Sequence, residues 1–492
     1  MSFNSLINQE KTIKEIVNIV WFKRDLRLSD HAPLKNAIEN SLPIILVYIF
    51  EDVLIEDEHY SERHWKFVND CLTDMISKLQ KKNLKLNVLK GNAIDIFKKL
   101  TNDFNVQNVY SYQETGIKVT FDRDKEVTQL FKKRSIKWIE YQNNGVIRGL
   151  IDRKDWSSKW TQFMSQEIDT PNLEKLKTID IKSKFDISKE IKDQRVFQKG
   201  GETEAIKLLK TFYSNRVISY SKNISKPLLS RYSCSRISPH LAWGSISMRQ
   251  VWKEYHEIYK SSQYKFPLRA FRSRLFWHCH FIQKFESEDR IEFENANRAF
   301  NEIRQDFKPD LVKAWEDGNT GYPLIDACMR CVNETGYLNF RMRAMLVSFL
   351  TNNLWQHWKH GVKHLARQFL DFEPGIHYSQ FQMQAGTFGT NAFRIYDPVK
   401  QSYDHDQNAE FIKEWVPELK DLPNNFALEP WTISEMDKVF YGFDNIKYPD
   451  RIIDQKESAK EARKKLFAVM KTELAKSERK RILRKHTKAS NR

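Results

Sequence analysis

Short apolar runs and amphipathic stretches alternate along the first third of the chain. Runs rich in Val, Ile and aromatic residues predict strands at 16–22, 42–50, 84–90, 105–113 and 136–143. Between the later runs, apolar residues recur at helical spacing, most clearly over 62–82 and 119–134. Because alternating strands and helices require crossover connections, this region predicts a parallel sheet covered by helices on both faces.

From about residue 203 to about 385, the apolar positions follow a helical period. The clearest row, spaced at i, i+4 along one predicted helix, consists of Met342, Leu346, Leu350, Leu354 and Trp358. Arg341 and Arg343 lie at the start of this predicted helix, beside the row, and Asp371 and Glu373 are the nearest acidic pair downstream. A buried arginine needs an anionic partner. The pattern fits a helical pocket for a large flat cofactor, with Arg343 paired to Asp371, and fits equally a helical core with a surface ion pair.

The remaining stretches divide the chain. Residues 144–202 are polar and rich in Lys and Asp, which predicts a connection laid over the surface. We expect an N-terminal extension over 1–15, an α/β domain over 16–143, a linker over 144–202, an all-α domain over 203–455 and a C-terminal extension over 456–492.

Charged side chains gather where the predicted strands end. Lys23, Arg24, Asp25 and Arg27 follow the first strand, and 114–116 follow the fourth. The α/β domain has Rossmann-like layering, but no Gly-x-Gly-x-x-Gly or Walker A loop follows a strand. Ligands of such sheets bind at the carboxyl ends of the strands, so we expect these residues to face a ligand.

The 492-residue chain has a net charge of +17, which favours an anionic partner such as nucleic acid, although a lysine-rich soluble surface explains part of the excess. The last 37 residues hold 14 Lys or Arg against 4 Glu. This tail is interpreted equally well as a nucleic-acid arm or as a solvated helix.

Cysteine usage and hydropathy argue against a disulfide-rich protein and against a membrane protein. Five cysteines make no disulfide framework in a chain of this size. Cys328 and Cys331 have redox or metal spacing, but they lie in a helical run without a second pair, so we expect buried thiols and no metal. The N-terminus is polar and no run approaches membrane-spanning length, so we expect a soluble, cytoplasmic protein without a membrane partner.

Four stretches, in order and correctly spaced, resemble the DNA photolyase/cryptochrome flavoprotein family. They are VWFKRDLRLSDHAPL (20–34), SRISPHLAWGSIS (235–247), GNTGYPLIDACMR (318–330) and RIYDPVKQSYDHDQNAEFIKEWVPEL (394–419). The resemblance spans about 17–455 and implies an α/β antenna domain followed by an all-α domain that binds FAD. It further implies a monomer that acts on DNA containing pyrimidine dimers, in a divergent bacterial branch of the family.

The resemblance implies which individual residues contact the cofactor. Those that match contacts to the FAD phosphates and ribityl chain are Tyr220, Cys234, Ser235, Ile237 and Ser238. Cys234 stands where a hydroxyl residue is usual. Arg343 and Asp371 match the ion pair beside the flavin ring, Glu373 matches the acid at the ring's edge, and His278 is also assigned to this site. SYQETG (111–116) resembles the antenna-facing loop. Three alternatives stay open for this loop: it binds a folate, it binds a deazaflavin, or it binds no chromophore.

The catalytic residues depart from the family pattern. Trp277 matches an aromatic wall of the lesion pocket, although a core aromatic would fit the same amphipathic stretch. Met383 replaces the second tryptophan of that pocket, and Phe340 replaces an Asn beside flavin and substrate. Arg274 stands where repair enzymes carry a lesion-contacting Glu, so Arg274 and Trp277, with Arg341, are expected to contact DNA. His377 stands where Asn normally faces flavin N5, which predicts an altered flavin spectrum.

The usual electron relay is also interrupted. Of the three relay tryptophans, only the middle one persists, as Trp358, while the flavin-proximal position is Phe381 and the surface position is Gln305. Phe is harder to oxidise than Trp, so slow or rerouted photoreduction is expected. Substitute carriers are Trp355 and Tyr378, with Tyr337 and Trp315 as further candidates.

The leading hypothesis is therefore a light-dependent lyase that splits cyclobutane pyrimidine dimers, with room for a single-strand preference. A cryptochrome-like photoreceptor that binds FAD without repair is the alternative, favoured by Arg274, Phe340 and the interrupted relay. A flavoprotein that binds nucleic acid without photochemistry is the third and weakest.

Overall fold

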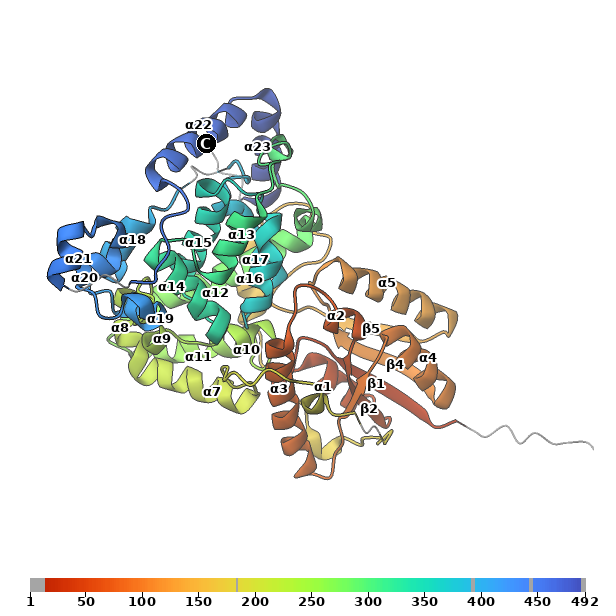
Figure 1. Ribbon diagram of the computed structural model, residues 1–492. Helices are drawn as coiled ribbons and strands as arrows, with labels where there is room; N and C mark the ends of the chain where they lie inside the picture. Colours follow the sequence, from red (N-terminus) through yellow and green to blue (C-terminus); the bar gives the residue numbers. More distant parts are fainter. Residues whose placement is uncertain (1–13, 183–184, 391–393, 442–445, 488–492) are drawn as a thin grey trace, which may run out of the picture.

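The computed structural model describes residues 14–182, 185–390, 394–441 and 446–487. A sheet domain is followed by a larger helical domain that lies against it (Figure 1). The predicted fold class, α/β followed by all-α, is confirmed. Most of the predicted 1–15 extension lies outside the described residues. Within the described part of the chain, no helix is long and apolar enough to cross a membrane.

The sheet consists of five parallel strands in the order β3-β2-β1-β4-β5. The strands are β1 (Ile16–Phe22), β2 (Ile44–Phe50), β3 (Asn87–Lys90), β4 (Asn105–Tyr112) and β5 (Lys137–Tyr141). All five predicted strands exist, and β3 is shorter than predicted. Alternate residues of β1 point to opposite faces: Val20 packs toward α1 and α3, and Trp21 packs toward α4 and α5. These four covering helices are α1 (Ala32–Glu39), α3 (Glu62–Gln80), α4 (Ala93–Asp103) and α5 (Lys118–Lys133).

The other helices complete the two domains and the segment between them. They are α2 (Asp52–Ile55), α6 (Trp156–Met164), α7 (Glu202–Thr211), α8 (Val217–Asn223), α9 (Ser230–Ser233), α10 (Ser238–Ala242), α11 (Met248–Ser261), α12 (Lys265–Ser287), α13 (Pro309–Asp317), α14 (Pro323–Thr335), α15 (Phe340–Ser348), α16 (Lys359–Gln368), α17 (Pro374–Gln384), α18 (Pro398–His405), α19 (Glu410–Trp415), α20 (Asn424–Leu428), α21 (Glu435–Tyr441), α22 (Gln455–Met470) and α23 (Glu473–His486).

The prediction of one helix carrying the apolar row from Met342 to Trp358 is wrong. α15 ends at Ser348, a π-helical turn spans Phe349–Asn353, and Trp355 adopts a left-handed φ of 54° before α16 begins. The row remains apolar and buried because the break keeps these side chains in the same core. An i, i+4 count cannot register the extra residue that a π turn inserts.

The connection over 144–202 does not lie only on the surface. It contains α6, whose Trp156 and Trp160 are almost completely buried against the helical domain. Further along, Thr178 forms a bridge with Ile44 at the start of β2, and Ile187 packs with the sheet domain. The segment therefore fastens the two domains together.

The loop after β1 forms the domain interface. Arg27 donates from Nη1 to the carbonyl of Gly244 at 2.9 Å, and the amide of Leu26 donates to the Trp243 carbonyl at 3.2 Å. Gly244 has a φ of +70°, and a Cβ there would lie 2.2 Å from the Arg24 carbonyl oxygen. The guanidinium of Arg27 is hydrogen-bonded to the carbonyls of Asp30 and Gly244, and Arg27 also lines a pocket together with Asp30 and Tyr112.

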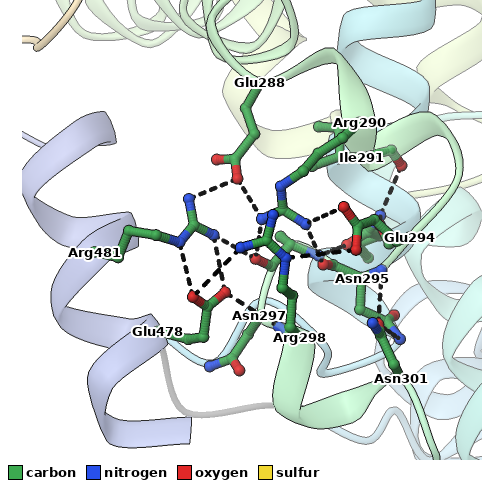
Figure 2. A network of polar contacts seen from close by, with 12 residues as sticks. Glu288, Arg290, Ile291, Glu294, Asn295, Asn297, Arg298, Asn301, Glu478 and Arg481 are labelled. Carbon is green, nitrogen blue, oxygen red and sulfur yellow. Dashed lines mark hydrogen bonds and ion pairs between the residues drawn. The ribbon is translucent and has the colours of Figure 1, made fainter. Parts of the chain in front are cut away.

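The described part of the C-terminal extension, up to residue 487, forms two helices that are docked on the helical domain. α22 and α23 pack on the helical domain at its end away from the sheet (Figure 1), where Leu466 and Ile482 are buried. Figure 2 shows Arg481 of α23 between Glu288 and Glu478, and it donates to Glu288 at 2.7 Å. His486 also bonds Glu288, at 2.5 Å. Its outward lysines and arginines stay exposed, so the hairpin combines a docked face with a basic face.

Candidate functional site

The site is built where α12 and α17 pack against each other, with α8 and α15 beside them. Arg343 on α15 and Asp371, just before α17, form a two-pronged ion pair, with N–O distances of 2.9 and 3.0 Å. The Arg343 guanidinium also lies over the Phe369 ring at 4.0 Å, and its Nε donates to the Leu338 carbonyl at 2.7 Å. Burial would raise the pKa of Asp371, but the Arg343 charge and hydrogen bonds lower it, so the pair is ionised. The predicted pairing is confirmed.

Glu373 stands at the start of α17, at the boundary between the domains. Its Oε2 lies 3.6 Å from Arg24 of the sheet domain, while Oε1 is buried with no hydrogen-bond partner among the described residues. Burial raises the pKa of this carboxyl, against the opposing charge of Arg24. Arg24 also donates to the Phe372 carbonyl at 2.5 Å, so the sheet domain holds the backbone on which Glu373 is mounted.

His377, one turn further along α17, is buried among Phe369, Phe372 and Phe381. One of its ring nitrogens, Nε2, lies 2.8 Å from the Val362 carbonyl. Because a carbonyl only accepts, the proton is on Nε2 and Nδ1 is left as an acceptor. Burial lowers the pKa of His377 to about 3, so the ring is neutral at physiological pH.

The predicted phosphate and ribityl contacts come from α8, the segment between α9 and α10, and the first residue of α10. Tyr220 and Ile237 are buried, and Cys234, Ser235 and Ser238 are half-buried. The Arg216 guanidinium donates to the carbonyl of Cys234, and burial raises the pKa of the Cys234 thiol to about 11, so it stays protonated. The structure places these five residues on consecutive elements of one helical core.

Arg236 is a residue that the sequence reasoning missed. Its φ is +60°, its guanidinium lies 3.5 Å from the centroid of the Tyr337 ring, and its Nε is buried without a hydrogen-bond partner in the described chain. His278 Nε2 and Ser221 Oγ are buried and unpartnered in the same sense. An arginine inside the matched segment SRISPHLAWGSIS was the signal that could have found it.

Unpartnered buried polar atoms mark places where a bound group completes the hydrogen bonding. Arg236 Nε suits a phosphate oxygen, while Glu373 Oε1 and His278 Nε2 suit the polar edges of a flavin. With the ionised Arg343–Asp371 pair beside them, the residues present fit FAD.

Three of the predicted lesion contacts are exposed, whereas the phosphate and ribityl contacts described above are buried or half-buried. Trp277 on α12 is 43% exposed and Phe340, the first residue of α15, is 49% exposed. Arg274 is exposed, and Met383 and Arg341 are half-buried. The ring of Trp277 stacks on Phe281 with centroids 5.6 Å apart. Trp277 is therefore not a core aromatic.

The electron-relay candidates divide into two groups. Trp358 is completely buried, donates from Nε1 to Asn295 at 2.8 Å, and lies 6.0 Å from Tyr378 between ring centroids. Tyr378 is 6.0 Å from His377, and Phe381 is 4.8 Å from His377, so these residues are adjacent. Trp355 stands apart from them, between the cationic groups of Arg304 at 4.6 Å and Lys465 at 4.8 Å.

The region of the antenna loop is filled by a buried ionic network. Arg123 bonds both Glu51 and Glu114, and Lys23 lies 3.9 Å from Glu114 and 3.7 Å from Asp124. Burial raises the pKa of Glu51 to about 7, against the lowering effect of Arg123. Lys23 and Arg24 also line a small pocket at the domain boundary, together with Glu114 and Glu373.

Cys328 and Cys331 are buried thiols, as predicted. Across the described ranges, no group of three or more His, Cys, Asp or Glu side chains is arranged to hold a metal ion.

Comparison with known proteins adds independent findings. A family model described as DNA photolyase matches residues 18–149, and one described as the FAD binding domain of DNA photolyase matches residues 271–468. The chain is 27% identical to cryptochrome DASH of Synechocystis sp., over 91% of this chain and 97% of that protein. It is 30% identical to the deoxyribodipyrimidine photo-lyase of Alkalihalophilus pseudofirmus, over 53% of this chain and 54% of that protein.

Among solved structures, the fold matches an archaeal photolyase from Sulfolobus tokodaii that holds two FAD molecules. The TM-score is 0.77 at 25% identity, covering 92% of this chain and 99% of the other. Both family models, the relatives and the structural match indicate the same family. The chain belongs to the DNA photolyase/cryptochrome family of FAD-binding flavoproteins.

Proposed function

We propose that this protein is a light-dependent DNA lyase that splits cyclobutane pyrimidine dimers. The observation that carries the proposal is the 43% exposure of Trp277, immediately before His278 of the cofactor site. An aromatic kept only for packing would be buried, whereas an exposed tryptophan offers a face on which an extruded base stacks. Phe340, 49% exposed at the start of α15, offers a second such face.

The charge of the molecule supports DNA as the partner. The net charge is +17, and Arg274 lies exposed one turn before Trp277 on α12. Arg341 is half-buried, and its Nε is unpartnered among the described residues, so it can contact a phosphate or the lesion. Splaying a dimer out of a duplex costs unpairing and unstacking, so we expect single-stranded or frayed DNA to be repaired faster.

The residues of the cofactor site have separable roles in this proposal. When bound, reduced FAD supplies the electron that opens the dimer and receives it back. Arg343 and Asp371 orient the ring, Glu373 and His278 meet its polar edges, and Arg236 with Ser235 and Ser238 contacts the phosphates. His377 offers only an acceptor, Nδ1, toward the ring, so it favours the protonated, reduced form of N5.

The test uses purified protein with chemically reduced FAD and an oligonucleotide carrying one thymine cyclobutane dimer. Restored thymines are followed by chromatography in light and in darkness, on single and double strands. Light-dependent restoration, faster on single strands, is the expected result. Failure to restore thymines, with FAD bound and reduced, would overturn the proposal.

A cryptochrome-like photoreceptor without repair activity is the second candidate. It is favoured by Arg274, which puts a cation where the family's repair enzymes are expected to carry an acid, and by relatives that include cryptochromes. In that case the same assay gives photoactive FAD and no repair.

A further inference from the structure

Tyr378 of α17 is joined to a base from the other domain. Its hydroxyl lies 2.6 Å from Nε2 of His59, which precedes α3 of the sheet domain, and Nδ1 of His59 lies 2.6 Å from Asp57 Oδ1. An ionised carboxylate only accepts, so Nδ1 carries the proton and Nε2 accepts from the tyrosine. The three groups form a directed chain in which Tyr378 donates to His59 and His59 donates to Asp57.

The ionisation of Asp57 is supported by its surroundings. Burial would raise the pKa of this carboxyl, but hydrogen bonds from His59 and the charge of Lys363 lower it. Burial raises the pKa of the Tyr378 phenol, and the charges of Glu292 and Asp57 raise it further, so the resting residue is a neutral phenol. A neutral phenol held 2.6 Å from a free imidazole nitrogen is within reach for proton transfer.

The position of Tyr378 connects this chain to the flavin site. It follows His377 directly, and its ring is 6.0 Å from that of Trp358, edge to face. Its ring also stacks on Phe285 at 5.9 Å, and His59 stacks on Phe372 at 5.5 Å, so both rings are fixed in place. Asp57, His59, Trp358 and Tyr378 line one groove, from which a proton has a route to solvent.

We propose that Tyr378, His59 and Asp57 form a proton-coupled electron donor that refills Trp358 during photoreduction. The electron leaves Trp358 for light-excited, oxidised FAD, and Tyr378 then returns an electron to Trp358. As it does so, the O–H bond of Tyr378 breaks and its proton forms a new N–H bond at His59 Nε2. The net change is one electron to the flavin, a neutral tyrosyl radical and an imidazolium held by Asp57.

Oxidation of a buried tyrosine is unfavourable because the radical cation that forms is strongly acidic and usually has no nearby base to accept its proton. His59 removes that difficulty, and Asp57 stabilises the resulting charge. The inference rests on the proposed function only through the photoactivity of bound FAD, and it holds for a repair enzyme and a photoreceptor alike. It also gives the relay a donor in place of the missing surface tryptophan, where this chain has Gln305, and this donor crosses the domain boundary.

The test illuminates protein containing oxidised FAD and ring-deuterated tyrosine, and identifies the radical by electron paramagnetic resonance. The wild type is expected to give a tyrosyl radical that Tyr378→Phe abolishes and His59→Phe strongly reduces. Tyr213→Phe, which removes a buried phenol that donates to the Val251 carbonyl rather than to a base, is expected to retain it. Radical formation is expected to slow in deuterated water only while His59 is present.

A second readout needs no flavin. In FAD-free protein, nitrogen NMR of His59 is expected to show the Nδ1-protonated tautomer, with the Nε2 resonance shifting in Tyr378→Phe. A tyrosyl signal that survives in Tyr378→Phe, or a yield and isotope effect unchanged in His59→Phe, would overturn the inference. Repair by chemically reduced FAD in the wild type is measured separately, so failure of that reaction overturns the proposed function and not this donor.

Discussion

At the scale of single residues, the site combines charged pairs and neutral groups whose states are set by burial. Asp371 is ionised because Arg343 grips both of its oxygens, while Glu373 has an oxygen without a partner in the described chain. His377 is neutral because burial opposes its protonation. The site therefore offers its ionised groups and its unpartnered hydrogen-bonding atoms on different side chains.

The Arg343–Asp371 pair is expected to be essential for stability as well as for FAD. Arg343→Met leaves the buried Asp371 carboxylate without its cation, which should lower the free energy of unfolding by about 3 kcal/mol. Urea unfolding, with the retained FAD measured in parallel, checks this. Lys313→Met removes a solvent-exposed partner of Asp317 and is expected to change neither quantity. Equal behaviour of the two variants would contradict a structural role for the pair.

His377→Asn is expected to change the absorption spectrum of bound flavin toward that of photolyases with Asn at this position. In the wild type Nε2 is occupied by the Val362 carbonyl, so only an acceptor is left, whereas an Asn amide can also donate. Oxidised flavin N5 is an acceptor and would gain a hydrogen bond. A visible spectrum identical to that of the wild type would show that His377 does not face the ring.

At the scale of elements, the domain interface depends on a close backbone approach. Gly244 lies at a φ of +70°, with the Arg24 carbonyl where a Cβ would be. Gly244→Ala should therefore add steric overlap to backbone strain and cost more than about 2 kcal/mol of unfolding free energy. Gly149 has a similar φ of +73° but open space around it, so a substitution there introduces backbone strain without steric overlap.

Gly149→Ala is expected to cost only the strain, about 1 kcal/mol. Denaturant midpoints of both variants give the comparison. Matching losses would mean that the interface relaxes around the added methyl group and that the close approach has no structural cost.

The strands of the sheet domain and two of its covering helices, α3 and α5, were predictable because each has a strong period. The Arg343–Asp371 pair was also predictable, from a buried arginine and the nearest acids. The π turn at Phe349–Asn353 was not, because its residues are as apolar as those of a regular helix. The contact of His59 with Tyr378 was not predictable either, since it joins residues 319 positions apart through domain packing.

At the scale of the whole molecule, many histidines are buried in their neutral form. Burial lowers the pKa of eight of them to about 3 or 4: His64, His240, His278, His280, His357, His364, His377 and His486. Unfolding exposes these rings and lets them bind protons near their ordinary pKa of about 6.5. At these histidines, the unfolded state thus binds more protons than the folded state below pH 6.5.

The stability that these histidines contribute is therefore expected to be fully present above pH 6.5 and to fall as the pH drops toward 4. Each such histidine contributes up to about 1.4 kcal/mol per pH unit in this window. Urea unfolding at pH 7.5, 6.5 and 5.5 should show a midpoint that declines steeply in the last step. A midpoint that is flat or rises on acidification would mean that the histidines are solvated or paired in the folded state.

Arg24 of the sheet domain contacts Glu373 and the Phe372 carbonyl of the helical domain. These contacts couple docking of the sheet domain to FAD binding in the helical domain. If ordering of the backbone before α17 favours FAD, then FAD must favour the docked sheet domain by the same free energy. Loading with FAD should then protect amides of β1 and the loop after it from hydrogen exchange, in a domain that contributes no helix to the flavin pocket. A helical domain produced alone should bind FAD more weakly than the full chain.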